Sequence, residues 1–192
     1  MLKYIIIAAM ATIQLHALAK YELHCDGRLI IASRDSALAQ VGTLERTNSN
    51  DGAVEKYLGI FGASRGTPYC AAGTYWCYAT AADALGISKS AIPIPKTLLA
   101  NAVYDYAVRF GEKSVYSAKI DDLIIWRKAR SIHGHIERII EVGEKGWVRT
   151  VAFNSSERIN GRVREGVFLK RRNIYHPLSN LMVRGLVGVI FR

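Results

Sequence analysis

The feature that most constrains the fold is a change of hydrophobic pattern at Gly111. Upstream of it, apolar residues recur at helical spacing in segments that are rich in alanine. Downstream, short runs rich in β-branched and aromatic residues are typical of strands. Helices first and strands later predict an α+β domain in which the helices pack on an antiparallel sheet of about five strands. The expected strands span residues 123–127, 132–142, 147–153, 163–171 and 186–191.

Three helices are expected before Gly111. The first covers residues 54–61, where apolar residues fall at i, i+3, i+4 and i+7. The second runs over 70–85 without a proline, and Gly86 suits its end. The third covers residues 97–109. Near the N-terminus the apolar residues 29–32 predict one short additional strand.

The size and charge of the chain limit the number of domains and the kinds of partner that are expected. The chain has 192 residues, half of them hydrophobic, which suits one globular domain and a monomer. Its formal net charge of +10 fits a nucleic acid, an anionic lipid surface or an anionic polymer such as bacterial cell wall. The charge alone does not choose between these partners.

The N-terminus has the three-part pattern of a secretory signal peptide. Lys3 is followed by an apolar segment over residues 4–18, and Ala17, Leu18 and Ala19 form a small-x-small cleavage pattern. The apolar segment is too short for a comfortable membrane span, so no integral span is expected once residues 1–19 are removed. The alternative is a buried N-terminal helix. Export predicts a secreted or periplasmic protein and argues against a nucleic-acid partner.

The cysteines point to a reactive thiol. Cys25, Cys70 and Cys77 are an odd number, so at least one thiol of an exported chain is free or bonded to another chain. Cys70 follows a Gly-Thr-Pro loop at the start of a predicted helix, where unpaired N–H groups favour thiolate and are placed to hold an oxyanion. Cys77 reads as a core residue or a disulfide partner, and Cys25 is one candidate partner for it.

A thiol nucleophile needs an imidazole base. His133 and His135 lie on one face of a predicted strand, and Gly134 between them allows close approach of another backbone. Asn154, at the end of the next strand, is a candidate to hold the distal ring nitrogen, which would give a Cys–His–Asn arrangement. A histidine taken alone is more often a surface or packing residue.

The same strand allows a zinc site. His133, His135 and Glu137 share one face, and two imidazoles with a carboxylate are a known ligand set for catalytic zinc. The competing interpretation is that Glu137 faces solvent and pairs with Arg138 or Lys128.

Several motifs resemble CHAP (cysteine, histidine-dependent amidohydrolase/peptidase) domains, which have a papain-like fold. The cysteine region shows Asn-Asp-Gly at 50–52, then Gly-Thr-Pro-Tyr-Cys-Ala-Ala at 66–72 and Trp-Cys at 76–77. Downstream, Asp122 with Leu-Ile-Ile-Trp at 123–126 resembles the family's Gly-Asp and apolar strand, and Gly-His-Ile at 134–136 resembles its histidine motif. The resemblance extends over residues 41–175 and closes with Asn-Ser-Ser at 154–156, Glu-Gly-Val at 165–167 and Lys-Arg-Arg at 170–172.

This resemblance implies a peptidoglycan hydrolase, either an endopeptidase on stem peptides or an amidase at the sugar–peptide junction, with no cofactor and no metal. The domain would span residues 41–192, after an N-terminal extension over 20–40. The resemblance implies Cys70 as nucleophile, His135 as base and Asn154 as the orienting residue. The candidate substrate-binding residues, which flank the cysteine and the histidine, are Tyr69, Trp76 and His133. The alternative function is a non-catalytic envelope-binding domain of the same fold.

The chain departs from the family pattern at three positions. Ala152 stands where family members often carry a glutamate two residues before the asparagine. Glu137 stands where a small residue is usual, and Asp121 replaces the glycine of Gly-Asp. With no glutamate at 152, the resemblance leaves Asn154 to orient His135 alone.

Overall fold

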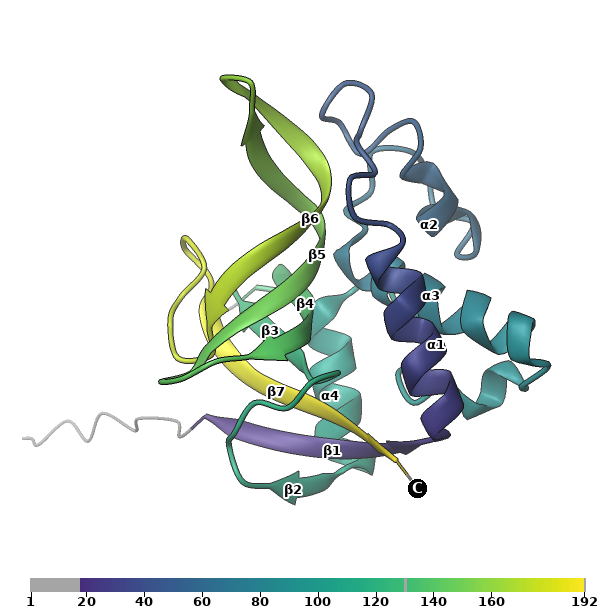
Figure 1. Cartoon of the computed structure of the whole chain (residues 1–192), viewed down its shortest axis with the longest axis vertical. Helices are drawn as coiled ribbons and strands as arrows, with labels where there is room; N and C mark the ends of the chain where they lie inside the picture. The colour runs from purple at the N-terminus through teal and green to yellow at the C-terminus, as the bar shows by residue number, and fades with distance from the viewer. Residues whose placement is uncertain (1–17, 130, 192) are drawn as a thin grey trace, which may run out of the picture.

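The structure is a computed structural model that describes residues 18–129 and 131–191. The predicted signal peptide, residues 1–19, falls outside the described residues except for its last two. The described chain is a mixed α+β fold with four α-helices and a seven-stranded sheet (Figure 1). The elements in order are β1 (Ala19–Cys25), α1 (Gly27–Leu38), α2 (Glu55–Gly59), α3 (Cys70–Leu85), the 3-10 turn η1 (Lys89–Ala91), α4 (Ala100–Phe110), β2 (Glu112–Ser114), β3 (Leu123–Arg127), β4 (Gly134–Val142), β5 (Trp147–Ile159), β6 (Arg162–Asn173) and β7 (Met182–Phe191).

The sheet has the strand order β2-β1-β7-β3-β4-β5-β6. Neighbouring strands are antiparallel except for β1 and β7, which are parallel. The sheet is therefore mixed and has seven strands, where an antiparallel sheet of about five was expected. Both unpredicted strands, β1 and β2, lie together at one edge. Residues 20–25 of β1 alternate strictly between polar and apolar, a strand signal that the expected fold leaves out, whereas β2 has only three residues.

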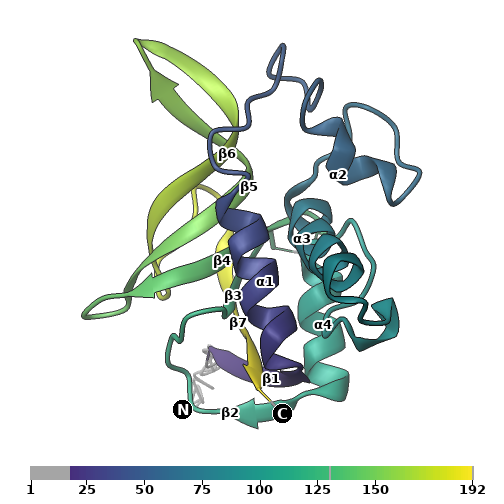
Figure 2. The same cartoon turned by 45° about the vertical axis from the view of Figure 1, so that its right-hand side comes forward.

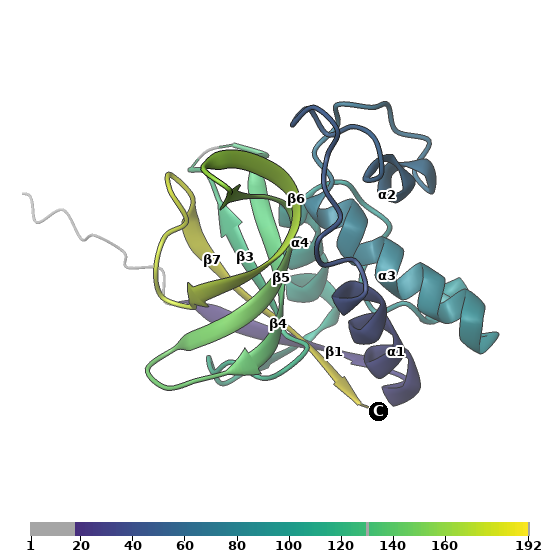
Figure 3. The same cartoon turned by 45° about the horizontal axis from the view of Figure 1, so that its top comes forward.

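Three helices cover one face of the sheet. Figures 1 and 2 show α1 and α3 side by side, with α4 against the same sheet. A buried cluster joins them to the strands through residues such as Tyr78 of α3, Val103 of α4 and Ile125 of β3. A second cluster, around Trp126 and Ile139, fills the opposite face, where the sheet is strongly curved (Figure 3).

The segment expected to form a strand at residues 29–32 belongs to α1. The Asp26 carboxylate accepts a hydrogen bond from the Arg28 N–H at 2.8 Å and so caps this helix. Leu29, Ile30 and Ser33 are buried against the sheet side, and this packing overrides the strand propensity of two consecutive isoleucines. Because β1 and α1 are part of the common sheet and core, the expected boundary at residues 40 and 41 does not separate two folded units.

The other expected elements are present with shifted bounds. The helix over 70–85 and the strand over 123–127 have the predicted ends, and Gly86 terminates α3 with a φ of 64°. The helix expected over 54–61 shrinks to the short α2. Strand β5 extends well beyond its predicted end and β6 starts one residue early, because Asn160 and Gly161 both have positive φ and form the tight turn of a long hairpin that projects from the sheet (Figure 1).

Candidate active site

Cys70 is the first residue of α3, as predicted, and its side chain is only 5% exposed. The residue before it, Tyr69, is the N-cap but makes no capping hydrogen bond through its side chain. The N–H groups of Cys70 and Ala71 therefore belong to a helix start that has no intrahelical acceptor for them. A sixteen-residue helix also places partial positive charge at this end, next to the sulfur.

Asn154 holds the chain just before the cysteine. Its Oδ1 accepts a hydrogen bond from the Tyr69 N–H at 3.1 Å, and its Nδ2 donates to Asn50 Oδ1 at 2.7 Å. Asn154 has a φ of 54° and lies where the β5–β6 register shifts between Ala152 and Ser155. This bulge turns the amide toward the start of α3. The expectation that Asn154 orients His135 is therefore wrong: the amide is occupied by the loops around the cysteine.

His135 lies near the start of β4, beside the indole of Trp126, with ring centroids 6.0 Å apart. Gly134 before it is required by close packing, because a Cβ there would lie 2.6 Å from the Trp126 carbonyl oxygen. The imidazole is buried and interacts with the Cys70 side chain, so the structure brings the predicted nucleophile and base together.

The residue that orients His135 is Glu137, two positions further along β4. Glu137 Oε1 lies 3.1 Å from His135 Nε2, and the carboxylate is fully buried. Arg172 of β6 donates to the same carboxylate through Nε at 3.0 Å and Nη2 at 2.8 Å, and the Thr150 hydroxyl donates to Oε2. The expectation that Glu137 faces solvent and pairs with Arg138 or Lys128 is wrong, because its partners point inward from three strands.

The strand register explains two of the departures from the family pattern. Glu137 and Ala152 are directly opposite each other on β4 and β5. The glutamate missing at 152 and the unexpected glutamate at 137 therefore occupy facing positions of one ladder. The carboxylate is retained, but it comes from the strand that carries the histidine.

The surroundings of Glu137 and His135 favour an ionised pair, a carboxylate beside an imidazolium. Burial opposes ionisation of Glu137, but the hydrogen bonds and charges of His135 and Arg172 outweigh it and lower its pKa to about 2. Burial likewise acts to lower the pKa of His135, but the interactions with Cys70 and Glu137 outweigh it and raise that pKa to about 10. Because Nε2 faces Glu137, Nδ1 is the ring nitrogen left to exchange a proton with Cys70.

The other two thiols are unsuited to nucleophilic attack. Burial raises the pKa of Cys25 to about 11 and that of Cys77 to about 12. All three cysteines lie in the described part of the chain and are free, so the Cys25–Cys77 disulfide considered from the sequence is absent. The two residues belong to different core clusters, which keeps them apart.

The three expected substrate-binding residues are placed differently from one another. The Tyr69 side chain is fully buried, stacks on Tyr57 and donates to Glu45 Oε1 at 2.9 Å, so it is a core residue. Trp76 is half-buried against Tyr57 and lies on α3 away from its start. His133 is exposed in the turn before β4, and of the three only its side chain is free to meet a ligand near His135.

The zinc alternative does not fit this geometry. His133 is exposed outside β4, whereas His135 and Glu137 are buried and already joined to each other. The Arg172 guanidinium on Glu137 would also repel a cation. Within residues 18–129 and 131–191, no three His, Cys, Asp or Glu side chains are grouped closely enough to hold a metal ion.

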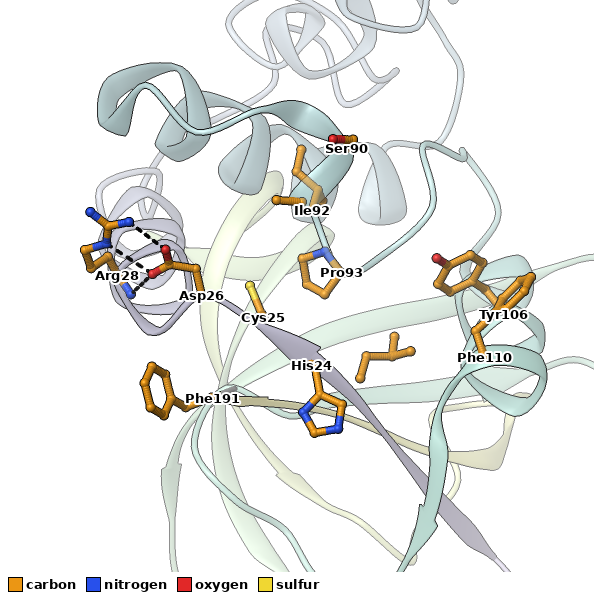
Figure 4. Close-up of a pocket in the computed structure, with 12 residues that line it drawn as sticks. His24, Cys25, Asp26, Arg28, Ser90, Ile92, Pro93, Tyr106, Phe110 and Phe191 are labelled. Carbon is orange, nitrogen blue, oxygen red and sulfur yellow. Dashed lines mark hydrogen bonds and ion pairs between the residues drawn. The ribbon is translucent and has the colours of Figure 1, made fainter.

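Two hollows are relevant to function. A pocket of about 460 Å³ begins at Gly134 and His135 and continues over β5, β6 and the loop at 178–181. A larger one, about 830 Å³, lies around Cys25 at the far end of β1 (Figure 4). There Cys25 is directed toward Pro93 while His24 leaves the strand on the other side, so this thiol has no imidazole base.

The smaller pocket therefore adjoins His135, which among the described residues is the only histidine paired with a cysteine. The described part of the chain contains no helix long and apolar enough to cross a membrane. No protein-family model, curated protein or solved structure matches the chain. The case for function therefore depends on the site itself.

Proposed function

We propose that the protein is an exported cysteine hydrolase of papain-like fold that cleaves amide bonds in bacterial peptidoglycan. The observation that carries the proposal is the chain of contacts from Cys70, at a helix start, to His135, Glu137 and Arg172. It supplies a nucleophile, a base and a buried group that holds the base, which are the parts that acyl transfer by a thiol requires. The substrate class comes from the resemblance to CHAP domains and agrees with the basic net charge.

The chemistry proceeds through a thioester. The Cys70 thiolate attacks the carbonyl carbon, a C–S bond forms, and the Cys70 N–H at the start of α3 stabilises the oxyanion. Imidazolium His135 gives its Nδ1 proton to the amine as the C–N bond breaks. His135 then takes a proton from water, whose oxygen attacks the thioester. The C–S bond breaks, the acid product leaves and the thiolate is regenerated.

Glu137 and Asn154 are positioning residues in this scheme. Glu137 fixes the ring through Nε2 and stabilises the imidazolium. Asn154 fixes the chain that leads into Cys70. The carboxylate of Glu137 takes the place of the glutamate that the family pattern has at position 152.

The proposal is tested with the chain lacking residues 1–19, incubated with purified peptidoglycan, beside its Cys70→Ala variant. We expect soluble fragments with new amine and carboxyl ends from the wild type only. Binding to the wall without release of fragments by either protein would instead support a non-catalytic envelope-binding domain.

A further inference from the structure

The pocket beside His135 has a composition that points to a ligand. It is lined by His135 of the proposed catalytic pair, so groups next to a scissile amide would enter it. Apart from one glycine and two leucines, all of its lining residues are polar. The lining residues are Gly134, His135, Asn154, Ser155, Ser156, Glu165, Lys170, Arg172, Leu178, Ser179, Asn180 and Leu181.

Arg172 is the cation of this lining that has a whole nitrogen without a partner. Its Nε and Nη2 both face Glu137, and Nη1 has no hydrogen-bond partner among the residues that the structure describes. Because the guanidinium is planar, an edge formed by Nε and Nη2 directs Nη1 to the other side. The side chain is 19% exposed, so it is not sealed from the pocket.

The other charged groups of the pocket are accounted for locally. The Lys170 ammonium is bonded to the Ser156 carbonyl oxygen and to the Glu157 carboxylate. Glu165 also lines the pocket, and burial together with the nearby Glu45 raises its pKa. Arg172 is therefore the positive group with a free nitrogen, Nη1, and it lies in a pocket that serine and asparagine residues also line.

We propose that this pocket binds a carboxylate carried by the substrate peptide, and that Nη1 of Arg172 is its principal donor. The inference rests on the proposed function, since it makes the substrate an acidic peptide with a free carboxyl group close to the cleaved amide. Arg172 then has two tasks: it holds Glu137 with one edge and selects the substrate with the other. A charge-assisted hydrogen bond of this kind is roughly twice as strong as a neutral one.

The experiment compares two peptidoglycan-derived peptides that differ only in the carboxyl groups flanking the scissile amide, which are free in one and converted to primary amides in the other. Dissociation constants are measured with the Cys70→Ala variant, and kcat/KM with the active protein. We expect the free acid to bind and react at least tenfold better. Arg172→Gln should bring both ratios close to one, because losses that affect both peptides equally cancel in a ratio.

Glu165→Gln is the matched control, since it changes the charge of the same pocket without contacting Glu137, and it should retain or increase the preference for the acid. Equal binding of the two peptides by the Cys70→Ala variant, or a preference that survives Arg172→Gln, would overturn the proposal. Preferential binding with no cleavage by the active protein would instead contradict the hydrolase function and leave carboxylate recognition standing.

Discussion

Replacing Glu137 by glutamine separates the charge of the buried carboxylate from its shape. The amide oxygen can still accept from Arg172 and Thr150, but the negative charge next to His135 Nε2 is lost. The imidazolium is then disfavoured by burial and by the Arg172 cation, and only the Cys70 thiolate still favours it. We therefore expect the pKa of His135, raised to about 10 in the wild type, to fall steeply.

The distance between Glu137 Oε1 and His135 Nε2 sets how far the pKa of His135 should fall. Unit charges 3.1 Å apart attract by about 5 kcal/mol at an effective dielectric constant of about 20, which sets an upper bound of about 4 pKa units. Relaxation around the neutral amide reduces this, and we expect a fall of about 2 units, equivalent to roughly 3 kcal/mol. At pH 9 the fraction of enzyme with protonated His135, and with it kcat/KM, should drop by about tenfold, since a pKa near 10 leaves most of the imidazole protonated and a pKa about 2 units lower leaves about a tenth of it so.

The assay needs no substrate. The rate at which iodoacetamide alkylates Cys70 is followed from pH 5 to pH 11, and mass spectrometry separates this thiol from Cys25 and Cys77. The alkaline limb that reports deprotonation of His135 should move down by about 2 pH units in Glu137→Gln. Glu141→Gln is the control, because that residue lies on the same strand but is 60% exposed and paired with Arg149. Superimposable profiles of wild type and Glu137→Gln would refute the assigned role of Glu137.

Three further outcomes follow from the geometry. Asn154→Gly keeps the positive φ but removes two hydrogen bonds, so it should lower the free energy of unfolding in urea by about 2 kcal/mol. Asn154→Ala should lower it by about 1 kcal/mol more because of backbone strain, and equal values for the two variants would contradict the strained bulge at this position. Gly134→Ala should destabilise the protein by about 1–3 kcal/mol and slow Cys70 alkylation, because the new Cβ would collide with the Trp126 carbonyl oxygen. Gly59→Ala has open space at its Cβ and should be neutral or slightly stabilising, so equal stability of the two alanine variants would rule out that collision. The difference in free energy of unfolding between wild type and Glu137→Gln should be largest at about pH 4.5–6.5. The stabilisation from Glu137 is lost as the pH falls toward about 2, and that from His135 is lost as the pH rises toward about 10. A difference that does not change with pH in denaturant titrations would contradict an ion pair.

Local signals account for the parts of the fold that could be predicted. The alanine-rich run after Cys70 ends at Gly86, and the run at 123–127 is apolar throughout, so both elements have the expected ends. By contrast, the alternation of polar and apolar residues over 20–25 is a strand signal that the expected fold leaves out, and the places of β1 and α1 depend on pairing with β7 and packing against α3. Such long-range contacts leave no mark on a short window of sequence.

The site divides in the same way. Cys70 and His135 could be found from their types and flanking residues, because a helix start and a Gly-His strand are local patterns. The role of Glu137 could not, since it depends on the register that sets it opposite Ala152 and brings Arg172 beside it. The spacing of two between His135 and Glu137 is the available signal, but from the sequence alone it also fits a zinc site or a solvent-facing glutamate. Asn154 was assigned to the wrong partner because a bulge redirects its side chain.

We propose that Cys70 is the nucleophile of an amide hydrolase acting on peptidoglycan, and mass analysis of the fragments released from purified wall tests this proposal. The wild type should release peptides with one new amine and one new carboxyl end for each cut, while Cys70→Ala, folded to the same melting temperature, should release none. Equal release by the two proteins, or no release by either under reducing conditions between pH 6 and pH 9, would contradict the account.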